Sequence, residues 1–257
     1  MVIDLTTDTH VHTSLCNHAS GTMEQYVQSA IDKGLKRLFF LEHLETEINT
    51  EFRSWLTDED FDTYFKEGKR LQQKYEGKIE IGLGVEVGYN PDNPRRIVER
   101  LSRREWDRIG LSYHFLKIPG HDEHLNMLSR NQRSIKMIDT HGNSTLLSHY
   151  FDTLIEAVQT VTADALCHLD AGLRHQPNLY LEDSHWIQIE ALLREVKRAG
   201  MALEINTSGY TYRGKPFPRP RVISMAQDMG LTFSAGSDAH SPGEVGRFFD
   251  RIPGLFA

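Results

Sequence analysis

Three histidines lie within nine positions near the start of the chain, in the segment DTHVHTSLCNHASG at residues 8–21. His10 and His12 are separated by one residue, so on a strand both side chains would point to the same face. Two imidazoles on one face can bind a single transition-metal ion. His18 follows a few residues later. The segment therefore predicts a metal site at the end of a strand, although a histidine-rich surface loop would have the same composition.

Side chains of the same types recur along the rest of the chain, each at the end of a short apolar segment. Taken singly, each of them is more often a structural residue than a ligand. Enzymes built on α/β barrels, however, form their sites at the C-terminal ends of the strands, where these residues would meet. They are His43 in LEH, Glu86 in GVEVG, His114 in LSYHF, His168 in CHLD, and Asp238 and His240 in GSDAH.

This set of side chains is too large for one metal ion. It contains seven histidines and two carboxylates, whereas zinc takes about four ligands and larger ions take about six. We therefore expect two or three ions, with Glu86 placed to bridge two of them, as carboxylates do in two-metal hydrolytic sites. Ligation rich in imidazole favours zinc, iron or manganese over magnesium or calcium.

The segments that position these residues alternate between short apolar strands and amphipathic helices. Helical spacing of apolar residues is found at 22–33, 147–158, 186–196 and 222–229, and Asn93 with Pro94 begins a shorter helix. This alternation predicts parallel βαβ units. Strands are expected near residues 4–10, 37–42, 79–87, 107–114, 165–169, 202–207 and 231–237.

Seven strands around one core predict a distorted (β/α)7 TIM-like barrel of the α/β class, and an open doubly wound sheet is the alternative. No segment has the composition of a linker, so we expect residues 1–257 to form a single domain. Residues 117–143 have the weakest pattern, and we expect an elaborated loop there with one short helix.

Composition excludes several classes of protein. The net charge of -7 argues against binding to long nucleic acids, which requires a basic surface. No segment approaches the ~20 apolar residues of a membrane helix, and the first residues do not have the features of a secretory signal. Only two cysteines are present, far apart in the sequence, which makes a disulfide framework improbable. We expect a cytoplasmic protein; its oligomeric state cannot be derived from the sequence.

The motifs DTHVHTSLCNHASG, LEH, GVE, SYH, CHLD, EINTSG and GSDAH together resemble the PHP (polymerase and histidinol phosphatase) family. More narrowly, they resemble its monofunctional histidinol-phosphate phosphatases, and the resemblance covers almost the whole chain. It implies a PHP-type barrel with three divalent metal ions. Carried over by residue, it assigns His10, His12, Glu86 and Asp238 to the first ion, Glu86, His114 and His168 to the second, and His18, His43 and His240 to the third.

The resemblance also implies a reaction, the hydrolysis of L-histidinol phosphate to L-histidinol and phosphate in histidine biosynthesis, by a hydroxide that bridges two metal ions. Asp238 or His240 would assist proton transfer to the leaving alkoxide. Arginine forms paired hydrogen bonds with phosphate oxygens, so Arg174 and Arg213 are predicted to contact the phosphate during catalysis, and Lys117 is a weaker candidate.

The cationic substrate also requires an acidic pocket wall, for which Glu42, Glu45 and Glu204 are candidates. Glu42 stands where the family usually has Asp before the histidine, a departure that bears on substrate contacts rather than on the metals. Asp8, outside the ligand set, is expected to orient a ligand histidine. Cys16 is expected to be a small packing residue.

Other functions remain open at this point. One is a PHP phosphoesterase that acts on a nucleotide or another small phosphomonoester. Another is a binuclear amidohydrolase, although that class usually bridges its metals with a lysine, and two metals would leave His18 and His43 without a role. A metal-binding domain without catalysis is a third, but such a domain would be expected to have lost ligands.

Overall fold

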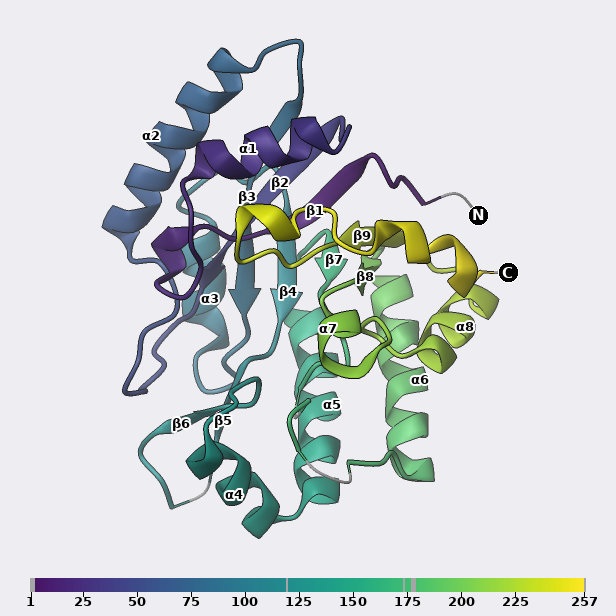
Figure 1. Cartoon of the computed structure of the whole chain (residues 1–257). Coiled ribbons are helices and arrows are strands. Elements are labelled where there is room, and N and C mark those ends of the chain that lie inside the picture. Colours follow the sequence, from purple (N-terminus) through teal and green to yellow (C-terminus); the bar gives the residue numbers. More distant parts are fainter. Residues whose placement is uncertain (1–2, 119, 173, 177–178, 257) are drawn as a thin grey trace.

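A sheet of seven parallel strands forms the centre of the computed structural model, which describes residues 3–118, 120–172, 174–176 and 179–256 (Figure 1). The strand order is β1-β2-β3-β4-β7-β8-β9, so each strand pairs with the next one of the barrel along the chain. The strands are β1 (Thr7–Val11), β2 (Arg37–Leu44), β3 (Glu80–Gly88), β4 (Ile109–Ser112), β7 (Ala165–Leu166), β8 (Ala202–Asn206) and β9 (Phe233–Gly236).

The sheet curves round until its two edge strands meet at their C-terminal ends. Val11 at the end of β1 forms a parallel bridge with Ala239, just beyond β9. The amide of His12 donates to the carbonyl of Ala239 at 3.0 Å, and the amide of Asp238 donates to the carbonyl of His10 at 2.8 Å. The fold is therefore a nearly closed (β/α)7 barrel, which confirms the predicted TIM-like architecture and rules out the open sheet.

Helices on the outside of the barrel connect the strands. α1 begins with the predicted capping box, in which Thr22 and Gln25 bond each other's backbone amides. The sequence did not single out α2, because few of its residues are buried among many charged ones. The connecting helices are α1 (Met23–Asp32), α2 (Asp58–Lys74), α3 (Pro94–Leu101), α5 (Asn143–Thr160), α6 (Asp183–Arg198) and α8 (Pro220–Asp228).

One connection is much longer than the others and lies beyond the C-terminal ends of the strands (Figure 1). Between β4 and β7 the chain forms an antiparallel hairpin of β5 (Phe115–Lys117) and β6 (His124–Asn126), followed by α4 (Gln132–His141). This is the elaborated loop with a short helix that the sequence predicted. The short helix α7 (Gly209–Arg213) lies between β8 and α8.

Buried polar side chains gather at the same end of the barrel. His10, His12, Glu86 and Glu204 are each at most 1% exposed, beside a core of aliphatic and aromatic residues. Buried charges of this kind must be paired or bound to metals to be tolerated. Of the helices in the described part of the chain, none combines the length and apolar character needed to cross a bilayer.

Candidate metal centre

The structure brings all nine predicted ligands together at the C-terminal end of the barrel. The strand register aligns them, since His43 on β2 is paired directly with Glu86 on β3. The other members stand on β1 or just beyond the ends of β1, β4, β7 and β9, except His18, which follows the 3-10 turn Ser14–Cys16. Alternation along β1 turns His10 and His12 to the same side, as predicted.

Glu86 lies at the centre of this group, and its two carboxylate oxygens face different histidines. Oε1 lies 2.7 Å from Nε2 of His168 and 3.2 Å from Nε2 of His114. On the other side, Oε2 lies 2.8 Å from Nδ1 of His43, 3.5 Å from Nε2 of His10 and 3.6 Å from Nε2 of His12. A carboxylate whose two oxygens face different histidines has the arrangement needed to bridge two metal ions.

A second carboxylate, Asp238, and two further imidazoles extend the cluster away from Glu86. Oδ1 of Asp238 lies 3.3 Å from Nε2 of His12, and Nε2 of His240 lies 2.9 Å from Nε2 of His18. The ring of His43 is stacked between the rings of His12, at 4.1 Å, and His18, at 5.2 Å. His43 therefore connects the inner and outer parts of the cluster.

Several buried atoms of the cluster lack the partners that a protein interior normally supplies. Among the described residues, Oε2 of Glu86, Nδ1 of His12 and Nε2 of His114 have no partner with hydrogen-bond geometry. The contacts of Oε2 of Glu86 with His43 and of Nε2 of His114 with Glu86 are short, but they are not aligned as hydrogen bonds. Ring nitrogens of His10 and His12 also face each other at 2.9 Å. A buried carboxylate oxygen left without a hydrogen bond is costly, and a cation between these atoms would remove that cost. The residues present therefore fit bound metal ions.

The pKa shifts of four members of the cluster, His12, His240, Glu86 and Asp238, suit ligation. Burial would lower the pKa of His10, but Glu204 and Glu86 raise it well above its usual range. Burial, and after it the neighbouring histidines, hold the pKa of His12 well below its usual range. Burial also lowers the pKa of His240. Burial would raise the pKa values of Glu86 and Asp238, but the surrounding histidines lower both well below the ordinary carboxyl value. Neutral imidazoles and ionised carboxylates are the forms that bind metals. Among the described residues, five groups have their ligand atoms within 4.8 Å of one another: His10, His12 and Glu86; His43, Glu86 and His114; His12, His43 and His240; Cys16, His18 and His240; and His10, Cys167 and Glu204.

Two further carboxylates hold two of the predicted ligand histidines in place. Each contacts the ring nitrogen that does not face Glu86. Oε1 of Glu204 lies 2.6 Å from Nδ1 of His10, and Oε1 of Glu45 lies 2.7 Å from Nδ1 of His114. Burial would lower the pKa of His114, but Glu86 and Glu45 raise it to about 10. Such carboxylate–histidine pairs orient metal ligands and raise their basicity. Glu45 and Glu204 therefore support the centre, which differs from the acidic pocket wall that the sequence predicted.

Two glycines leave room for these supporting carboxylates. A Cβ atom at Gly88 would lie 2.0 Å from Oε1 of Glu45, and one at Gly236 would lie 2.2 Å from Oε1 of Glu204. Any larger residue would displace the carboxylate that holds a histidine. The glycines of GVEVG and SAGSD are thus part of the site.

Asp8 acts on the backbone. Its carboxylate accepts hydrogen bonds from the amides of His10 at 3.3 Å, Ser237 at 2.9 Å and Gly246 at 2.8 Å. It therefore fixes the ends of β1 and β9 relative to each other, and it acts on His10 through the backbone amide rather than through the imidazole ring. The backbone is strained nearby: His168 has φ 28° and Asp238 has φ 51°. Left-handed backbone at residues other than glycine is costly and tends to occur at functional sites.

Replacing Glu204 with glutamine is expected to weaken zinc binding by about 10–100-fold, as loss of an outer carboxylate typically does. Glutamine keeps the shape, but it removes the charge that orients and polarises His10. Titration of the metal-free protein with zinc in competition with a chelator measures the change. Glu190→Gln on the exposed side of α6 is the matched control; equal affinity in both variants would contradict the role given to Glu204.

A cavity of about 520 Å³ opens above the cluster, and its basic lining differs in part from the prediction. Arg174 lines it, as predicted, and so does Arg130, which the sequence did not indicate. The guanidinium groups of Arg174 and Arg130 lie 4.2 Å and 5.2 Å from the ring centre of Tyr212, which also lines the cavity. The three side chains form a basic wall opposite the carboxylates, which suits an anionic ligand.

The other predicted substrate contacts lie outside this lining. Arg213 forms an ion pair with Asp170 at 2.8 Å, and the exposed Lys117 lies 3.4 Å from Asp92. Glu42 is fully buried and accepts hydrogen bonds from the amide and hydroxyl of Thr13. Its side chain points away from His43 because neighbouring strand residues face opposite sides.

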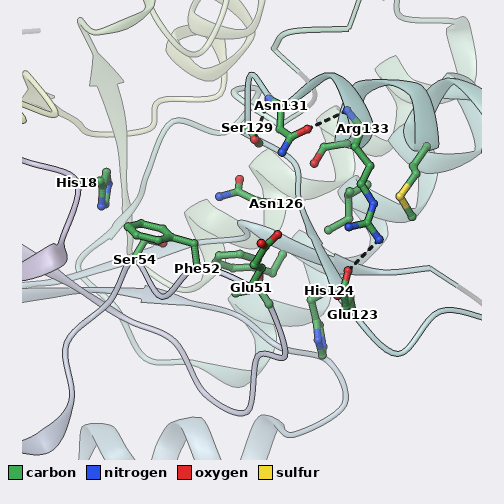
Figure 2. A pocket seen from close by; sticks show the side chains of 15 residues that line it. His18, Glu51, Phe52, Ser54, Glu123, His124, Asn126, Ser129, Asn131 and Arg133 are labelled. Carbon is green, nitrogen blue, oxygen red and sulfur yellow. Dashed lines mark hydrogen bonds and ion pairs between the residues drawn. The ribbon is translucent and has the colours of Figure 1, made fainter.

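A second pocket, shown in Figure 2, joins the cavity at its edge, since His18, Ser54, Phe115 and Asn126 line both. The remainder of its wall comes from residues 50–52 and from the β6–α4 part of the long insertion. Sequence analysis could not locate this pocket, because its walls are loops that are distant in sequence and carry no periodic pattern.

Comparison with known proteins agrees with the geometry. The family model described as "PHP domain" matches residues 8–208, and the model described as "PHP-associated" matches residues 218–252. A probable histidinol-phosphatase of Deinococcus radiodurans is 30% identical over 247 residues, covering 95% of this chain and 90% of the relative. The histidinol-phosphatase of Bacillus subtilis is 25% identical, covering 95% of this chain and 96% of its own length.

Two solved structures share the fold. A putative histidinol phosphatase from Listeria monocytogenes superposes with a TM-score of 0.84 at 20% identity, covering 95% of this chain and 99% of that one. The histidinol phosphate phosphatase from Lactococcus lactis, complexed with zinc, L-histidinol and phosphate, gives 0.76 at 19% identity, covering 97% and 91%.

Proposed function

Since the chain belongs to the PHP domain family, we propose that it is a metal-dependent phosphatase whose substrate is L-histidinol phosphate. The observation that carries the proposal is the centre itself, in which Glu86 faces histidines on both sides and Oε2 of Glu86 has no hydrogen-bond partner among the described residues. The names of the relatives and the ligands of the Lactococcus lactis structure support the choice of substrate. The reaction would release L-histidinol and phosphate, a step of histidine biosynthesis.

We propose that the centre holds three divalent transition-metal ions. The donor set favours zinc, iron or manganese, because imidazole predominates. Glu86 would be shared by the first two ions. The assignment is His10, His12, Glu86 and Asp238 to the first ion, Glu86, His114 and His168 to the second, and His18, His43 and His240 to the third.

Bound metal ions supply a water of lowered pKa and neutralise charge on the phosphoryl oxygens. The remaining tasks fall to the protein. Arg174 and Arg130 would bind phosphoryl oxygens at the basic wall and orient the ester toward the cluster. Arg213, predicted to do the same, is paired with Asp170, and it would stabilise this wall without contacting the ester. The carboxylates of the cluster would keep the ring nitrogens fixed while charge develops on the phosphoryl group.

Asp238 would carry the proton to the leaving alkoxide. Both nitrogens of its alternative, His240, are already engaged, since Nδ1 lies 3.0 Å from the carbonyl oxygen of Asp238 and Nε2 faces His18 at 2.9 Å. By contrast, Oδ2 of Asp238 only accepts a hydrogen bond from the hydroxyl of Ser208, at 3.3 Å. A carboxylate with one weakly engaged oxygen at the cavity wall can take the proton given up by the attacking water and pass it to the alkoxide. Because the histidines hold its pKa low, Asp238 would act as a relay and not as a resting acid.

We further propose that the parts matched by the two family models form one domain. β9 lies within the second matched part, yet it pairs with β8 of the first part over four residue pairs, from Leu203 with Phe233 to Asn206 with Gly236. The segment after β9 delivers Asp238 and His240 to the centre. The cluster would be incomplete without it.

A phosphate-release panel tests the proposed function. We expect the purified protein to prefer histidinol phosphate over nucleoside monophosphates and 4-nitrophenyl phosphate, by at least about tenfold in kcat/KM, which corresponds to about 1.4 kcal/mol of transition-state binding. Preference for a nucleotide would replace the substrate with the alternative PHP activity. Absence of phosphate release from every ester, in protein loaded with zinc or manganese, would contradict the phosphatase assignment.

A further inference from the structure

We propose that the side pocket of Figure 2 binds the cationic part of the substrate's alcohol and that Glu51 selects for its positive charge. The inference rests on the proposed phosphatase function and specifies the class of its substrate: phosphate monoesters of amino alcohols. It also replaces Glu42, Glu45 and Glu204 as the acidic wall, since each of those carboxylates holds another residue of the site.

The position of the pocket fits a leaving group. It begins at His18, Ser54, Phe115 and Asn126, the residues that it shares with the cavity above the metal cluster. An ester whose phosphoryl group lies between the cluster and Arg174 can therefore extend its alcohol into this pocket without crossing a wall. The basic wall of Arg174 and Arg130 lines only the central cavity, so the two ends of the substrate would meet different charges.

The charge of the pocket is negative. Its lining includes two carboxylates, Glu51 and Glu123, and one lysine or arginine, Arg133. Arg133 lies 3.3 Å from Glu123 and neutralises it. Glu51 forms no ion pair with any residue that the structure describes. His124, also in the wall, adds no charge near neutral pH, because burial lowers its pKa. One unbalanced carboxylate remains.

The carboxylate of Glu51 is directed into the pocket, toward the side chain of Asn126 on β6 (Figure 2). A carboxylate and an amide oxygen together can accept the hydrogens of a primary ammonium group. Phe52, the next residue along the chain, also lines the pocket, and it exposes 59% of its surface, which is unusual for a side chain of its size. An aromatic face in the same lining can bind an organic cation and can also stack on a flat ring.

The same charge disfavours other esters. A nucleotide with further phosphates, or a sugar diphosphate, would bring a second anion beside Glu51. Esters of neutral alcohols would gain no binding energy from the carboxylate. The pocket therefore predicts selectivity through the cation, separate from the hydrolytic chemistry at the metals.

The test compares E51Q with the wild-type metal-loaded enzyme on histidinol phosphate and 4-nitrophenyl phosphate at low ionic strength. Loss of one charge-assisted hydrogen bond should lower kcat/KM for histidinol phosphate by about tenfold, and 4-nitrophenyl phosphate hydrolysis should stay within about twofold. E47Q is the matched control, because Glu47 lies on the same loop but outside the lining. The double variant E51Q/E123Q should lose more of its kcat/KM for histidinol phosphate, because the charge of Arg133 is then unbalanced and makes the pocket positive. Affinity for L-histidinol by calorimetry should fall in parallel.

The outcomes separate this inference from the function on which it rests. If wild-type enzyme hydrolyses histidinol phosphate and E51Q does so equally well, Glu51 does not select the cation and the inference is wrong while the function stands. An equal loss on both esters also overturns it, because the effect would then concern catalysis. Wild-type enzyme that hydrolyses 4-nitrophenyl phosphate with no preference for a cationic ester overturns the inference and the substrate, but not the phosphatase. Absence of all turnover overturns the function.

Discussion

Replacing Glu86 with glutamine is expected to lower phosphate release by about 10³-fold, the upper end of the loss seen when one group that stabilises a transition state is removed. Glu86 is fully buried and faces histidines through both oxygens. Glutamine has nearly the same shape but no charge, and one of its two polar ends is an amide donor that would face ring nitrogens. Both metal positions that share this residue should therefore weaken together. Steady-state phosphate release and metal content per chain measure the effect.

Glu80→Gln serves as the control for this substitution, because Glu80 begins the same strand but is exposed and paired with Arg37. Its variant should retain full activity. Circular dichroism should show both variants folded. Turnover of a folded Glu86→Gln protein within about tenfold of the wild type, a difference of only about 1.4 kcal/mol, would exclude Glu86 as a bridging ligand.

Removal of the metals by a strong chelator is expected to abolish phosphate release and to lower the melting temperature. Without cations, ring nitrogens such as those of His10 and His12 at 2.9 Å remain crowded against one another, and Oε2 of Glu86 keeps no hydrogen-bond partner among the described residues. A ligand that binds only the folded state raises its stability by mass action, so its loss destabilises the fold. Thermal denaturation and an activity assay before and after chelation provide the measurement.

Adding metal ions back should distinguish the loss of activity caused by metal removal from a loss caused by irreversible denaturation. Zinc, manganese or ferrous iron should restore activity and melting temperature, whereas calcium should not, because imidazole-rich sites suit transition metals. Full activity after exhaustive chelation, with less than one ion left per five chains by analysis, would contradict metal-dependent catalysis.

The barrel and the cluster could be predicted from the sequence because both depend on the periodic spacing of apolar residues along the chain. Short apolar segments that alternate with amphipathic helices specify parallel strands, and parallel strands bring their C-terminal ends together. The pattern therefore predicts that His43 and Glu86 meet at one end of the barrel, and the register of β2 with β3 pairs them directly.

Roles that depend on which way a long side chain turns could not be predicted in the same way. Glu45 lies just beyond the end of β2, two residues after His43, so the strand pattern places both on one face, but that pattern does not predict that Glu45 reaches His114. Arg130 lies in a loop and Arg213 ends the five-residue helix α7, so neither stands on an element whose sequence period fixes the direction of its side chain. Packing against Tyr212 brings Arg130 to the cavity, and Asp170 holds Arg213 elsewhere.

Elemental analysis of the protein, purified without chelator and loaded with zinc or manganese, measures how many metal ions the centre holds. We expect about three transition-metal ions per chain, as nine ligand side chains require when each ion takes about four ligands and some are shared or supplied by water. Glu86→Gln should lower that number while Glu80→Gln leaves it unchanged. Fewer than one ion per chain in the active wild-type protein would exclude the proposed metal centre.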